Sequence, residues 1–151
     1  LPVWFGGRSD AALRRVGRLG DGWLASAVSP EEVRVMAPRI QEHATAAGRA
    51  IDEDHYGVIV PYWITADRDA ALERVATGLL RLRPDASPAD YAAIGSAAGC
   101  RDLVRRYIDA GASKFVMRPV CPPTETLAQL NYLAGEVLPA FHTTAAAMEM
   151  R

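Results

Sequence analysis

Apolar residues along the chain recur in two alternating patterns. Segments built on adjacent apolar residues, typical of buried strands, stand at residues 2–6, 22–25, 56–64 and 114–118. Between these runs, apolar residues recur every three or four positions, as they do on one face of a helix. This alternation predicts parallel strands in sequence order, joined by right-handed crossovers and covered by helices on one side.

The segment "SPEEV" is the clearest start of a helix. Ser29 can act as the N-cap, Pro30 suits the first helical position, and Glu32 completes a capping box. Pro38 removes one main-chain hydrogen bond, so it is expected to kink or split this helix. The apolar stripe that the helix is expected to bury consists of Val33, Met36, Ala37, Ile40 and Ala44.

Two later segments complete the predicted elements. Residues 84–99 interrupt the plan as a helical excursion, because Ser87 and Pro88 repeat the cap pattern before a short helix that carries Tyr91 and Ile94. The last helix is expected to start near Thr124. Its expected buried residues are Leu127, Leu130, Leu133, Val137 and Leu138.

The length of the chain limits the architecture. A chain of 151 residues is expected to form a single domain, here residues 1–151. A closed barrel of eight strands and eight helices needs about 250 residues. The predicted fold is therefore α/β, half of a (β/α)8 TIM barrel with four parallel strands and covering helices. An open four-stranded α/β layer is the geometric alternative.

Composition excludes several classes of protein. The 17 Lys and Arg residues balance 18 Asp and Glu residues, so no excess charge favours nucleic acid or an anionic membrane. No apolar run approaches the roughly 20 residues of a membrane span. Cys100 and Cys121 stand far apart, which fits a reducing cytoplasm. The sequence has no Cys/His cluster, so no metal site is expected.

Candidate chemistry lies at the carboxyl ends of the predicted strands, where parallel α/β proteins place their sites. Gly6 and Gly7 allow main-chain N–H groups to approach an anion, and Ser9 caps a helix whose positive end points there. Arg8 adds a cation, so these four residues form a candidate phosphate site. A plain strand-to-helix turn with no ligand also favours glycine, and this alternative stays open.

Arg118 lies at the end of the last predicted strand and is a candidate for substrate binding. Its guanidinium could hold a carboxylate or a phosphate. A solvated arginine or the partner of a surface ion pair fits the same position equally well. The residues alone therefore leave its role open.

Several segments together resemble one known family. The strings "PVWFGGRSDAALRRVGRLGDGWL", "SPEEV", "YIDAGASKFVMRPV" and "LAGEVLPAF" resemble the carboxyl-terminal half of the luciferase-like monooxygenases. Those enzymes are TIM-barrel oxidoreductases that use FMN or the deazaflavin coenzyme F-420. The resemblance implies hydride transfer or oxygen insertion on a small organic substrate, and the "GRxGDGWL" form favours F-420 over FMN.

The resemblance also implies roles for particular residues. It places Leu1 in the fifth barrel strand, so this chain would supply the fifth to eighth units. Gly6, Gly7, Arg8 and Ser9 would bind the cofactor phosphate, and Arg118 would hold the substrate. The catalytic residues, which stay unknown, would lie mostly on the first four strands.

Two functions of different classes follow from these observations. In the first, the chain is part of a full-length flavin- or deazaflavin-dependent oxidoreductase and is inactive alone. The alternative is a non-catalytic α/β half-barrel binding module that self-associates. In both cases the unpaired edges of the sheet are expected to bind a partner, either a second copy in a homodimer or an amino-terminal half.

Overall fold

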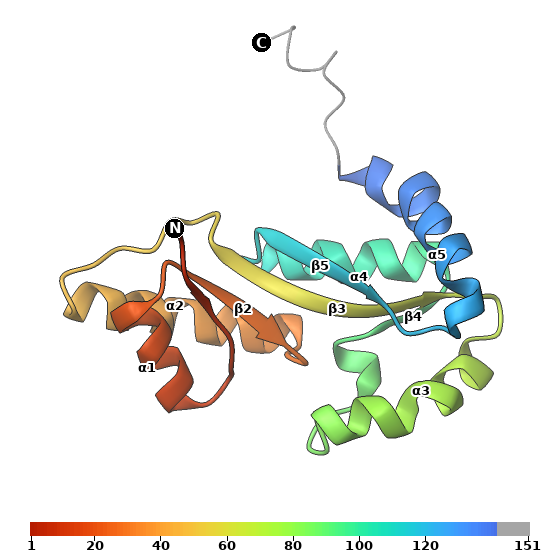
Figure 1. The fold of residues 1–151 in the computed structure, drawn as a ribbon, viewed down its shortest axis with the longest axis horizontal. Coiled ribbons are helices and arrows are strands. Elements are labelled where there is room, and N and C mark those ends of the chain that lie inside the picture. Colours follow the sequence, from red (N-terminus) through yellow and green to blue (C-terminus); the bar gives the residue numbers. More distant parts are fainter. Residues whose placement is uncertain (142–151) are drawn as a thin grey trace, which may run out of the picture.

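The computed structural model describes residues 1–141, in which five parallel strands form one sheet (Figure 1). The strands are β1 (Trp4–Phe5), β2 (Gly22–Ser26), β3 (Tyr56–Ile64), β4 (Ala93–Gly95) and β5 (Lys114–Pro119). The α-helices are α1 (Asp10–Leu19), α2 (Pro30–Ala46), α3 (Arg68–Leu82), α4 (Ala97–Asp109) and α5 (Thr126–Tyr132). No helix within the described residues is long and apolar enough to cross a bilayer.

Four of these strands are the predicted ones, and they are neighbours in sequence order. β1 pairs with β2, β2 with β3, and β3 with β5, all in parallel. On one edge of β3, Ile59 pairs with Ser26 of β2, and on the other edge it pairs with Val116 of β5. The chain thus has the predicted α/β fold of half a TIM barrel.

β4 is a strand that was not predicted from the sequence. It pairs with the last three residues of β3, Tyr62–Ile64, along the same edge of β3 that pairs with β2 nearer the start of the strand. The predicted helix carrying Tyr91 and Ile94 is wrong, since only a 3-10 turn, Pro88–Asp90, forms there. Ile94 instead lies beside Trp63 in the sheet, where pairing with β3 outweighs the local cap signal.

Pro61 lies inside β3 without ending it. Carbonyl groups along β3 alternate between its two edges. The carbonyl of His55, just before β3, accepts from Trp23 of β2, and that of Tyr62 accepts from Val120, just after β5. Pro61 therefore faces the edge shared by β2 and β4. There, β2 pairing stops at Ile59 and β4 pairing starts at Tyr62. The missing N–H falls in this gap between the two partners, which is why the strand tolerates a proline.

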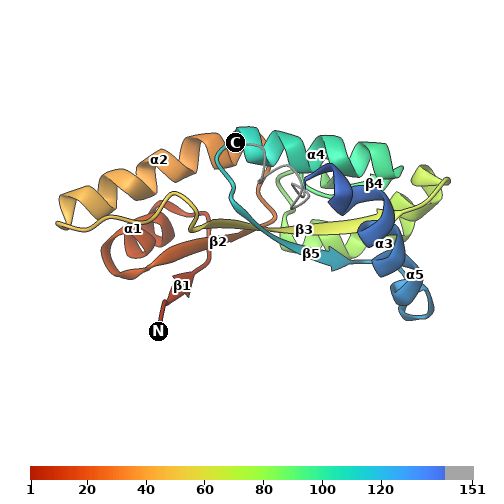
Figure 2. The same cartoon turned by 90° about the horizontal axis from the view of Figure 1, so that it is seen from above.

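The sheet has a hydrophobic core on each face. The larger core includes Trp23, Val58 and Tyr62 and packs under α1, α2 and α4; Figure 2 shows α2 and α4 on the same side of β3. The smaller core lies at the carboxyl end of β3, where Trp63 contributes to the opposite face and packs with Ala71 and Leu79 of α3. The expectation that helices cover one side only is therefore wrong at this end.

α2 runs unbroken through Pro38. Its predicted stripe faces the larger core, because Val33, Ile40 and Ala44 are buried and Met36 and Ala37 are partly buried against it. The predicted capping box is present, with the Ser29 hydroxyl accepting from the main-chain N–H of Glu32.

The last helix packs on the sheet differently from the prediction. Leu133 and Val137 are buried, whereas Leu127 and Leu130 are 71% and 46% exposed. The residue of α5 that faces the sheet is Gln129, which is 3% exposed. Its side-chain amide bonds both the N–H and the C=O of Ile64, at 2.7 and 2.9 Å. A polar residue thus completes the end of β3, and the leucines beside it face outward.

Candidate functional site

The turn between β1 and α1 holds the predicted phosphate-binding residues. The Ser9 hydroxyl accepts from the main-chain N–H of Ala12 at 3.3 Å, and the Ser9 carbonyl accepts from the N–H of Leu13 at 2.9 Å. Helix α1 therefore begins directly after Ser9. Within residues 1–141, no acceptor pairs with the main-chain N–H groups of Gly7, Arg8 and Ser9. These donors and the positive end of α1 can together bind an anion.

Gly7 shapes this turn through its backbone conformation. Its φ of +108° is a value that L side chains rarely adopt, and an added Cβ would lie 2.7 Å from the Cβ of Ala12. The Gly7 carbonyl accepts from the indole Nε1 of the buried Trp23 at 2.9 Å. The turn is therefore held against β2, with no room for a side chain at this position.

Arg8 extends from the turn toward the loop after α3. Its guanidinium lies 3.7 Å from a carboxylate oxygen of Asp85, and its side chain is 37% exposed. A hydrogen bond from Arg83, with a smaller contribution from Arg8, holds the pKa of Asp85 below its ordinary value. Arg8 and Ser9 line a cavity of about 540 Å³, whose other lining residues are Glu32, Met36, Arg83 and Asp85.

Arg83 belongs to this cluster but was not predicted as a site residue from the sequence. Its side chain is 8% exposed and donates to both carboxylate oxygens of Glu32, at 2.6 and 2.9 Å. It also donates to the Ala27 carbonyl at 2.6 Å and to Asp85 at 2.7 Å. These bonds join the loop after α3 to the end of β2 and the start of α2, beside the candidate phosphate site.

The ion pair between Arg83 and Glu32 shifts both side chains toward their charged forms. The hydrogen bonds from Arg83 hold the pKa of Glu32 below 4.5, although partial burial acts in the opposite direction. The pKa of Arg83 is raised, chiefly by Glu32. No local pattern distinguishes Arg83 from the neighbouring Arg81, since the contacts come from segments far away in the sequence.

Arg118 lies at the end of β5, as predicted, but not in the same cavity as the turn. It lines a groove of about 550 Å³ between α3 and the end of β5. The cavity at Arg8 and the groove at Arg118 share no lining residue. The structure therefore keeps the two predicted sites apart within this part of the chain.

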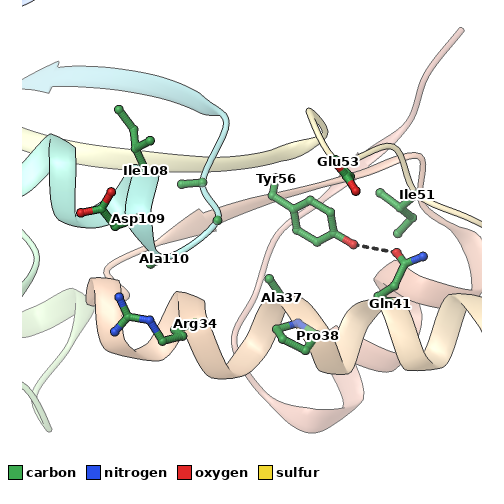
Figure 3. A pocket seen from close by; sticks show the side chains of 12 residues that line it. Arg34, Ala37, Pro38, Gln41, Ile51, Glu53, Tyr56, Ile108, Asp109 and Ala110 are labelled. Carbon is green, nitrogen blue, oxygen red and sulfur yellow. Dashed lines mark hydrogen bonds between the residues drawn. The ribbon is translucent and has the colours of Figure 1, made fainter. Parts of the chain in front are cut away.

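A further cavity, of about 670 Å³, lies at the opposite end of the sheet between α2 and the carboxyl end of α4 (Figure 3). Tyr56, the first residue of β3, donates its hydroxyl to Gln41 there at 3.0 Å. Parallel α/β folds carry their sites at the carboxyl ends of the strands. The position of this cavity at the amino end argues against a catalytic role.

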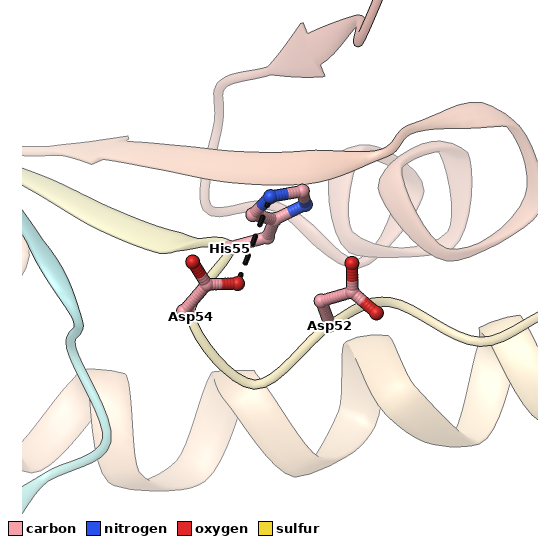
Figure 4. A group of neighbouring side chains, drawn as sticks. All are labelled: Asp52, Asp54 and His55. Atoms are coloured by element: carbon pink, nitrogen blue, oxygen red, sulfur yellow. Dashed lines mark ion pairs between the residues drawn. The ribbon is translucent and has the colours of Figure 1, made fainter.

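Three potential metal ligands also meet at the amino end of β3. Asp52, Asp54 and His55 bring one ligand atom each to within 4.8 Å of one another (Figure 4). Lys114 donates to Asp54 at 2.8 Å and holds its pKa low, and His55 Nδ1 donates to the Asp21 carbonyl at 2.7 Å. These contacts explain the cluster as a link between neighbouring strands and turns.

Comparisons with known proteins agree on one family. The sequence profile of the luciferase-like monooxygenases matches residues 1–81. A 5,10-methylenetetrahydromethanopterin reductase from Methanopyrus kandleri is 33% identical over 73 residues, which are 48% of this chain and 21% of that protein.

Solved structures share the fold over nearly the whole chain. An F-420-dependent secondary alcohol dehydrogenase in complex with an F-420–acetone adduct is 17% identical with a TM-score of 0.73, over 95% of this chain and 49% of that one. The F-420-dependent tetrahydromethanopterin reductase of M. kandleri is 21% identical with a TM-score of 0.66, over 94% and 51%. A type II Baeyer–Villiger monooxygenase with FMN, encoded on a Pseudomonas putida plasmid, is 14% identical with a TM-score of 0.65, over 93% and 48%. The chain spans about half the length of these structures.

Proposed function

Because the chain belongs to the luciferase-like monooxygenase family, we propose that it supplies the cofactor-phosphate subsite and part of the substrate pocket of a flavin- or deazaflavin-dependent oxidoreductase. Coenzyme F-420 is favoured over FMN, since two of the similar structures are F-420-dependent enzymes. One of these two is a tetrahydromethanopterin reductase from the same organism as the curated relative, itself a methylenetetrahydromethanopterin reductase. FMN is the second candidate, because it accompanies a similar monooxygenase structure.

The observation that carries this proposal is the set of unpaired donors at the turn before α1. The N–H groups of Gly7, Arg8 and Ser9 have no acceptor within residues 1–141, and Arg8 adds a positive charge beside them. The phosphate group of either cofactor accepts several hydrogen bonds and carries negative charge, so it fits this donor set.

The roles of this chain in the reaction are binding and orientation. A bound flavin or deazaflavin would itself supply the hydride or oxygen chemistry. The turn at Gly7–Ser9 would hold the phosphate, and α1 would stabilise its charge. Arg118 would bind the small organic substrate. In isolation the chain is expected to show no turnover.

The phosphate subsite can be tested by comparing FMN with riboflavin, which lacks the phosphate. We expect the chain to bind FMN about tenfold more tightly, as for hydrogen bonds to a charged group. Arg8→Gln is expected to remove most of this preference. Arg14→Gln is the control: it removes the same charge from an exposed position on α1 and should leave the preference intact. Fluorescence titration measures all six affinities, those of the wild-type chain and the two variants for each ligand. Equal affinity of the wild-type chain for FMN and riboflavin would refute the subsite.

We also propose that the face of the sheet opposite to α2 and α4 binds a partner. Val116 on β5 is 47% exposed, and Ile59 beside it on β3 is only half-buried. Both face away from α2 and α4, on the side that would line a barrel. The outer edges of β1 and β5 have no strand partner within the described residues. The chain is therefore expected to form a homodimer, or to pair with a polypeptide that carries the other barrel units.

Light scattering at micromolar concentration tests this self-association. We expect the wild-type chain to be dimeric, and Val116→Asp to weaken the dimer about tenfold or more, because a charge replaces apolar contact area. Leu80→Asp, on the exposed side of α3, is the control and should leave the dimer intact. A wild-type chain that stays monomeric at these concentrations contradicts the homodimer.

A further inference from the structure

The groove at Arg118 lies on the face of the sheet opposite to α2 and α4. α3 packs there on the smaller core, and the groove runs between α3 and the residues that end β5. Its volume of about 550 Å³ lies within the range of small-molecule sites. Because it is at the carboxyl end of β5, it has the position at which parallel α/β folds bind ligands.

The walls of this groove are mostly aliphatic. Val75, Leu79 and Leu82 come from α3, and Val120 follows β5. Leu82 is 45% exposed and Val120 is partly buried, so apolar surface is accessible to a ligand here. The body of a ligand that contacts these side chains would therefore be a hydrocarbon chain or ring.

The charged residues of the groove are both arginines, Arg74 and Arg118, and no acidic residue lines it. Within residues 1–141, neither guanidinium has a carboxylate at ion-pair distance. Arg74 lies 5.6 Å from the centre of the Trp63 ring. The nearby Glu125 instead accepts from Trp63 Nε1 at 3.1 Å. Two cations without an acidic partner thus border an aliphatic surface.

We propose that this groove binds an organic acid, with its carboxylate at Arg118 and Arg74 and its aliphatic body against α3. Its role as the substrate site rests on the proposed function, whose small organic substrate it narrows to an acid. Guanidinium groups bind carboxylates in a planar, bidentate manner. The contact with Trp63 orients Arg74, so less conformational entropy is lost when a carboxylate binds.

Hexanoate and hexanamide test this site, because they share the aliphatic body and differ in charge. By NMR titration of the chain, hexanoate is expected to bind about tenfold more tightly than hexanamide. Arg118→Gln and Arg74→Gln are each expected to lose most of this preference. Arg81→Gln, on α3 outside the groove, removes the same charge and should retain it. Acetate, which lacks the body, should bind more weakly than hexanoate.

The outcomes separate this site from the phosphate subsite. Equal affinity for hexanoate and hexanamide, or equal losses in the Arg118→Gln and Arg81→Gln variants, overturns the acid site. If the preference for FMN over riboflavin persists in that case, the proposed function stands without it. If the hexanoate preference is found but FMN and riboflavin bind alike, the acid site stands and the proposed cofactor role is refuted.

Discussion

Replacing Arg83 with methionine is expected to lower the free energy of unfolding by about 3 kcal/mol, because it leaves a partly buried carboxylate without its partner. Glu32 would lose two charge-assisted hydrogen bonds, and the carbonyl of Ala27 would lose its donor. Arg81→Met is the matched control, since that side chain lies on the exposed side of α3. Arg81→Met should change the free energy of unfolding by no more than about 0.5 kcal/mol. Chemical denaturation measures both, and similar values for the two variants would contradict the assigned role.

The same ion pair sets the dependence of stability on acid. The pKa of Glu32 is lowered in the folded chain, so its contribution is fully present above 4.5, its ordinary value, and is lost as the pH falls through the lower folded value. The pKa of Asp85 is lowered too, chiefly by Arg83. The difference in unfolding free energy between wild type and Arg83→Met should therefore shrink below about pH 4.5. A difference that stays constant down to pH 2 would exclude this ion pair as its source.

Gly7→Val is expected to destabilise the chain by about 3 kcal/mol and to abolish the preference for FMN. A β-branched side chain at positive φ is strained, and its Cβ would also collide with that of Ala12. Gly111→Val separates the two costs, because Gly111 has a φ of +100° but no heavy atom within 4 Å of an added Cβ. The loss in unfolding free energy should be at least about 1 kcal/mol smaller for Gly111→Val than for Gly7→Val, and Gly111→Val should bind FMN normally. Equal losses in both variants would show that the space at the turn is not restricted.

The parts of the fold that could be predicted are those set by local sequence. β3 was predicted with its observed bounds, since nine apolar or small residues in succession fit a strand buried on both faces. The start of α2 was also predicted, because the capping box involves only Ser29 and Glu32, which are three residues apart.

The errors occurred where distant segments decide the structure. β4 forms because β3 extends beyond β2 and leaves an edge to be paired, which nothing near Ile94 indicates. In α5, Gln129 faces the sheet because Ile64 needs hydrogen-bond partners, so the periodic leucines point outward. Arg83 was missed for the same reason, since its partners at Glu32 and Ala27 are more than fifty residues away.

For the candidate site, the sequence placed Gly6, Gly7, Arg8 and Ser9 at a strand-to-helix turn, and the structure has them there. Whether Arg118 shares their cavity depends on how α3 and the loop after it fold over the sheet. That loop brings Asp85 to Arg8, whereas α3 itself borders Arg118, so the two sites are separate.

Backbone NMR of the chain during titration with FMN tests whether the turn before α1 is a phosphate subsite. The amide signals of Gly7, Arg8 and Ser9 should show the largest shifts, because their N–H groups would donate to the phosphate. Riboflavin should leave these signals in place. If FMN instead shifts amides elsewhere, or shifts these three no more than riboflavin does, the turn is only a structural connection between β1 and α1.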